Sequence, residues 1–110
     1  MSDEYQIDIP PSFFALYTDA RQRLTEPLRV VRARYDVCED LANHLVEYAT
    51  QVHRGIGVAE DEVLRRCHAG LMSPDAGVST TEAVWIVRRL AELLGWEALA
   101  HADGRGAASQ

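Results

Sequence analysis

Apolar residues recur along most of the chain at steps of three and four, the spacing of one face of an α-helix. The longest run lies between residues 26 and 54, and no glycine or proline interrupts it after Leu28. About half of the circumference of such a helix is apolar, as in a helix that contacts several neighbours. The stripe is formed by Leu28, Val31, Tyr35, Cys38, Ala42, Leu45, Ala49 and Val52. This pattern predicts a long central helix over residues 26–54.

The same spacing predicts three shorter helices, at residues 12–24, 60–71 and 80–94. Ser79 and Glu82 have the spacing of a capping box at the start of the last one, and Gly95 is suited to end it. Residues 1–10 are expected to be a short extended segment, 11–100 a single helical domain and 101–110 a flexible tail. The fold class is therefore predicted to be all-α, with about four helices organised around the long one.

The charged residues of the chain exclude several kinds of chemistry. Seventeen acidic and 11 basic residues give a net charge of −6, and every basic residue is arginine. Without lysine the chain cannot form a Schiff base or a Walker-type phosphate loop. An acidic domain also repels phosphate backbones. No apolar run is long enough to cross a membrane and no secretory leader is recognisable, so a cytoplasmic location is expected.

Residues able to hold a metal or to attack a substrate are few. Asp40, His44 and Glu47 follow one another at steps of four and three, but the Glu-x-x-His pattern of di-iron bundles is absent. We interpret these three residues as a solvated helix face. Cys38 and Cys67 each fall on an apolar stripe, where a thiol is a small core residue. No enzymatic activity, metal or other cofactor is expected.

Residues 60–94 suggest an alternative function. Two helices joined by a turn resemble a helix-turn-helix, and the second would present Arg88 and Arg89 to DNA. The connection from Met72 to Val78 is longer than the three or four residues usual in that motif. A DNA-binding regulator is therefore the second choice.

Trp85 falls outside the apolar sector expected for the last helix. That sector is predicted to contain Val84, Val87, Leu90, Ala91 and Leu94. Arg88, Arg89 and Glu92 surround Trp85 instead, and tryptophan and arginine are enriched at binding hot spots. Two interpretations stay open: Trp85 belongs to a contact surface with Arg88 and Arg89, or it covers another segment of the same chain.

The long helix favours self-association. Its apolar stripe is longer than the other helices, so Leu28, Val31 and Tyr35 are expected to be buried between two copies. Arg34 projects from the apolar half and needs either solvent or a carboxylate from a second subunit. Basic residues lie in the first third of the helix and acidic ones follow, an order that an antiparallel dimer would complement.

Three segments together resemble a family of short, largely uncharacterised bacterial proteins, some labelled "ATPase with chaperone activity". The segments are Ile9–Phe13, Leu41–Glu47 and Glu62–Leu71. The resemblance covers roughly residues 5–97 and implies a helical partner or adaptor of larger machinery. We carry over no catalytic residue, because the chain lacks a phosphate loop. The predicted function is a non-enzymatic, homodimeric protein-interaction module, with another protein as a further candidate partner and with no membrane or nucleic acid bound.

Overall fold

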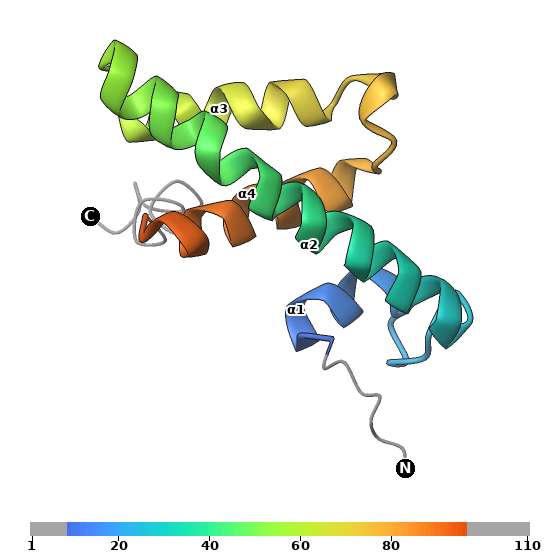
Figure 1. Ribbon diagram of the computed structural model, residues 1–110. Coiled ribbons are helices and arrows are strands. Elements are labelled where there is room, and N and C mark those ends of the chain that lie inside the picture. The colour runs from blue at the N-terminus through green and yellow to red at the C-terminus, as the bar shows by residue number, and fades with distance from the viewer. Residues whose placement is uncertain (1–8, 97–110) are drawn as a thin grey trace. The chain divides into compact units, whose positions relative to one another are not determined.

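The computed structural model describes residues 9–96, and within this range the chain is all-α, as predicted (Figure 1). The elements in chain order are α1 (Pro11–Phe14), η1 (Ala15–Tyr17), α2 (Leu28–Thr50), η2 (Gln51–Ile56), α3 (Glu60–Leu71), η3 (Pro74–Ala76) and α4 (Thr80–Leu94). The long central helix is confirmed as α2 and its continuation η2. The expected flexible tail and most of the expected N-terminal segment lie outside the described residues.

The chain divides into two compact units, Met1–Val37 and Cys38–Gln110, and the division falls inside α2. In the first unit, Phe13 is completely buried. Its ring lies 5.7 Å from that of Tyr17 and 5.5 Å from that of Tyr35, the latter edge-on. An isolated antiparallel bridge joins Thr18 to Leu24 and returns the chain toward α2. This unit is therefore built around one aromatic cluster.

The helix predicted over residues 12–24 is wrong beyond Tyr17, where η1 ends. Asp19 explains the difference. Its Oδ1 accepts hydrogen bonds from the backbone N–H groups of Arg21 and Arg23, at 2.9 and 3.0 Å. Aspartate often offers the backbone such a local alternative to the helical ladder. A turn thus replaces the last two turns of the predicted helix.

The second unit has an apolar core to which α2, α3 and α4 all contribute. Figure 1 shows α3 leaving the end of α2 through a tight turn and α4 following through η3. The buried residues of the cluster are Ala49, Val52, Val63, Leu64, Cys67, Leu90 and Ala91. All four residues predicted to face inward from α3 are buried, namely Val63, Leu64, Cys67 and Leu71. The core placement predicted for Cys38 and Cys67 is confirmed as well.

The predicted helix ends of α2 and α4 are also confirmed. Ser79 accepts a hydrogen bond from the backbone N–H of Glu82 at 3.1 Å, and Glu82 accepts one from the backbone N–H of Ser79 at 2.9 Å. Gly57 and Gly95 end η2 and α4 with φ angles of 86° and 80°. Glycine reaches this left-handed region without the clash that a Cβ causes.

The face that α4 turns inward is wider than the predicted one and does not include Val84. Leu90 and Ala91 are buried and Val87 and Leu94 pack against the core, all as expected, but Val84 is 40% exposed. The buried residues of α4 are Glu82, Ala83, Trp85, Ile86, Leu90 and Ala91. Apolar residues occupy most of the circumference of this helix, so periodicity alone left more than one face possible. The prediction omitted Ala83 and Ile86, which are buried, and wrongly included Val84.

Candidate interaction surface

Trp85 is 7% exposed, which argues against the interpretation that it belongs to an exposed contact surface. Its neighbour Ile86 is completely buried, so both residues belong to the buried part of α4. A side chain with so little accessible area cannot be the centre of a contact surface while the chain stays folded. The alternative interpretation, that Trp85 covers part of its own chain, is the one the burial supports.

The predicted contact residues at the start of α2 have different environments. Val31 is completely buried within the single chain, so it has no surface to offer a second copy. Tyr35 is half-buried and contacts Phe13 edge-on. Leu28 is 46% exposed and is therefore available. The single chain therefore already buries part of the apolar stripe of α2. Less of the stripe is left for a second copy than the length of the helix suggested.

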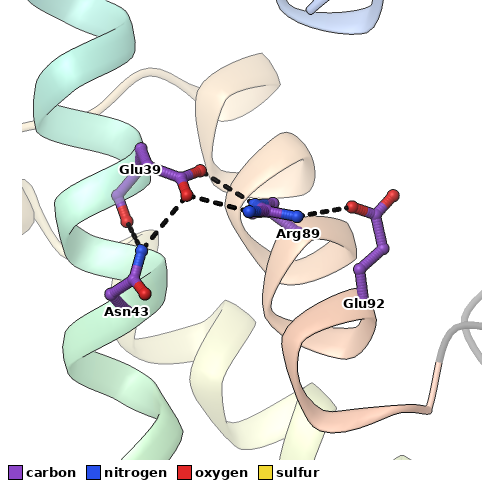
Figure 2. Close-up of polar contacts among 4 residues, drawn as sticks. All are labelled: Glu39, Asn43, Arg89 and Glu92. Atoms are coloured by element: carbon purple, nitrogen blue, oxygen red, sulfur yellow. Dashed lines mark hydrogen bonds and ion pairs between the residues drawn. The ribbon is translucent and has the colours of Figure 1, made fainter.

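The three arginines predicted to form contacts also differ. Arg88 is exposed and Arg34 is half-buried. Arg89 is held inside the second unit by an ion pair that joins α4 to α2 (Figure 2). Its Nε and one terminal nitrogen donate to the two oxygens of Glu39 at 2.9 and 3.0 Å. The other terminal nitrogen donates to Glu92 at 3.0 Å.

The electrostatics of this ion pair follow from its two-pronged geometry. The hydrogen bonds from Arg89 lower the pKa of Glu39, against the opposing effect of partial burial. The same bonds raise the pKa of Arg89. Asn43 donates a further hydrogen bond to Glu39 at 3.2 Å. The residue pattern along α2 does not reveal the pair, because the partner of Glu39 lies 50 residues away.

The outer face of α2 in the second unit is exposed and mixed in character. Its exposed residues are Asp40, Asn43, His44, Glu47, Tyr48 and Gln51. Tyr48 is 45% exposed, although it is large and partly apolar. His44 Nδ1 lies 3.0 Å from the carbonyl oxygen of Asp40 and 3.8 Å from its carboxylate. We call these six residues the α2 outer face.

This face does not assemble a metal site in the structure. Within residues 9–96, no group of three or more histidine, cysteine, aspartate or glutamate side chains is placed to hold a metal ion. The contacts of His44 are with Asp40 through a single ring nitrogen, as in an ordinary helix pair. Asp40, His44 and Glu47 therefore act as separate surface groups.

A second cluster lies where α2 ends, and the sequence did not point to it. His53 Nδ1 lies 2.8 Å from the carbonyl oxygen of Val58, and its Nε2 lies 3.7 Å from Glu60. The ring of Trp96 meets that of His53 edge-on, with centroids 5.1 Å apart. The turn that creates these contacts is η2, a π-helical segment, and such segments occur frequently at functional sites. We call these four residues the His53 junction.

The helix-turn-helix alternative gains little from the geometry of α3 and α4. The connection between them runs from Met72 to Ser79 and contains η3. Of the two arginines expected to contact DNA, Arg89 is neutralised by Glu39 and Glu92, whereas Arg88 is exposed.

Comparisons with family models, curated proteins and solved structures found no match for this chain. The resemblance carried by the three sequence segments therefore stays a prediction. Among the described helices, none combines the length and the apolar character that crossing a membrane requires.

Proposed function

We propose that this chain is a non-enzymatic protein-interaction module, an adaptor or regulator that binds through the α2 outer face. The observation that carries the proposal is the exposure of Tyr48 between charged neighbours. Tyrosine is enriched in protein interfaces because its ring buries a large area and its hydroxyl can still form hydrogen bonds. Asp40 and Glu47 add negative charge to the same face, which favours a partner that carries arginine and an apolar side chain.

The chain itself contains a segment of this chemistry. At the start of α2, in the first unit, Leu28 is 46% exposed and Arg29 is exposed beside it. We therefore favour a second copy as the partner. The start of α2 in one copy would contact the α2 outer face of the other, and the same contact would recur in reverse. Such a reciprocal interface is the commonest way in which identical chains associate.

The expected association is weak. An exposed ion pair such as Arg29 with Glu47 contributes about 0–1 kcal/mol. Asp36 and Asp40 follow Arg29 in the sequence and would repel acidic residues of a second copy. Most of the binding free energy must therefore come from the apolar area of Leu28 and Tyr48, and we expect a micromolar dissociation constant.

Sedimentation velocity over a range of concentrations tests the proposal. Tyr48→Glu and Arg29→Glu should each shift the chain toward monomer. Combining Arg29→Glu with Glu47→Arg should restore association, because the reversed pair again joins opposite charges. Val84→Glu is the matched control, since Val84 is a similarly exposed apolar residue on α4. A monomer at every concentration, or a dimer unaffected by Tyr48→Glu, would contradict the proposal.

We also place the module in the cytoplasm. Cys38 and Cys67 are both buried and are not joined in a disulfide. Thiols that stay reduced are the rule in the cytosol, whereas secreted domains of this size often carry disulfides.

A further inference from the structure

The His53 junction connects three parts of the second unit. His53 belongs to the last turn of η2, Val58 and Glu60 precede and begin α3, and Trp96 follows α4. The backbone N–H of Trp96 donates to the carbonyl of Ala91 at 2.7 Å, which fixes the chain beyond Gly95. One imidazole therefore touches the ends of α2 and α4 and the beginning of α3.

The protonation state of His53 decides how many of these contacts are attractive. A carbonyl oxygen can only accept, so Nδ1 must carry the proton that it shares with Val58. In the neutral ring Nε2 then has a lone pair, and the nearby group is the carboxylate of Glu60 at 3.7 Å. Protonation places a second N–H on Nε2 and converts this contact into an ion pair. The carbonyl end of α2 also favours a positive charge in its last turn.

Among residues 9–96, the one ion-pair contact of His53 is the one with Glu60. Arg54 follows it on the same turn and is exposed. On α3, Asp61 lies 3.6 Å from Arg65. On the last turn of α4, Glu92 binds Arg89. Among the described residues Glu60 is thus the carboxylate that responds to His53, while Glu97, the residue after Trp96, lies outside them.

We propose that the His53 junction is a pH-responsive latch, which tightens when His53 is protonated. Histidine is the side chain that normally changes charge between about pH 8 and about pH 5. In the protonated form, His53 would hold Glu60, at the start of α3, and Trp96 more firmly against the end of α2. The switch is separate from the α2 outer face, so it stands or falls independently of the proposed partner.

Two measurements on the full chain test the latch. Hydrogen exchange followed by NMR should show the amides of Val58 and Trp96 better protected near pH 5.5 than near pH 8, after correction for the intrinsic rate. The change should be up to about fivefold, the size expected for a partly exposed ion pair. In a Trp85→Phe variant, the fluorescence of Trp96 should also fall on acidification, because a protonated imidazole quenches a neighbouring indole. The wild-type NMR measurement does not depend on this variant.

Three controls make the test specific. His53→Gln should abolish both pH-dependent changes, whereas His44→Gln should preserve them. His44 is the matched histidine, because it too contacts a backbone carbonyl through Nδ1 and a carboxylate on its own helix, but its side chain is 75% exposed. Glu60→Gln should remove the change in protection, and Glu97→Gln should not. Persistence of the changes in His53→Gln, or equal protection at both pH values in the wild type, would overturn the proposal.

Discussion

Arg89 forms the ion pair that joins α4 to Glu39 of α2. Its guanidinium binds both oxygens of Glu39 and one of Glu92, and the side chains of Arg89 and Glu39 are 32% and 23% exposed. Water therefore screens the pair less than an ordinary surface ion pair, and removing one partner leaves the other incompletely solvated.

Replacing Arg89 with methionine should lower the free energy of unfolding by about 1–2 kcal/mol at pH 7. Because the folded-state pKa of Glu39 lies below its ordinary value of 4.5, its contribution is present above that pH and is lost as the pH falls through the folded-state pKa. The difference between wild type and variant should therefore shrink in acid. Urea unfolding at several pH values measures this, and Arg88→Met, at an exposed position, should change stability by less than about 0.5 kcal/mol.

Trp85 provides a second test at this scale. Because it is buried, Trp85→Ala should cost about 3–5 kcal/mol of folding stability, the range for a large aromatic removed from a core. Val84→Ala, one residue earlier and 40% exposed, should cost far less. Urea unfolding followed by circular dichroism compares the two without relying on the lost fluorophore. Equal small effects would mean that Trp85 is not part of the core.

At the scale of the element, the sequence predicts helices better than the directions in which they face. The start of α4 follows from a local signal, Ser79 with Glu82, and its end follows from Gly95. The turn at Asp19 was missed because the apolar spacing continues through it. The hydrogen bonds of Asp19 compete locally with those of a helix, and apolar periodicity does not detect such competition. The Glu39–Arg89 pair and the His53 junction depend on tertiary contacts. The spacing of residues along one helix does not reveal such contacts.

The cap of α4 can be tested directly. Ser79→Ala removes the side-chain acceptor for the N–H of Glu82 and should destabilise the second unit by about 1 kcal/mol. Thr80→Ala is the control, because Thr80 is exposed and is the first residue of the helix. Thermal unfolding should place the Thr80→Ala midpoint close to that of the wild type and the Ser79→Ala midpoint several degrees lower.

At the scale of the whole molecule, charge sets the expected partners. A net charge of −6 opposes binding to a polyanion, and Arg89 is already neutralised by two carboxylates. The arginines of α3 are also paired, since Arg66 donates to Glu62 at 3.0 Å. These hydrogen bonds lower the pKa of Glu62, so its charge persists into acid.

We therefore expect at most weak binding to duplex DNA. An electrophoretic mobility assay at physiological salt should give no shift at micromolar protein, and Arg88→Ala should make no difference. A sub-micromolar, salt-dependent shift that Arg88→Ala weakens would instead favour the DNA-binding alternative, because each phosphate contact steepens the dependence on salt.

The ion pair between Glu39 and Arg89 also bears on the order in which the second unit folds. Its partners are 50 residues apart, whereas α3 and α4 are neighbours along the chain. Closing a long loop costs more entropy than joining adjacent helices, so we expect the pair to form after the rate-limiting step. Arg89→Met should then accelerate unfolding and leave the refolding rate nearly unchanged in stopped-flow experiments. The ion pair would therefore determine how long the folded state lasts rather than how quickly it is reached.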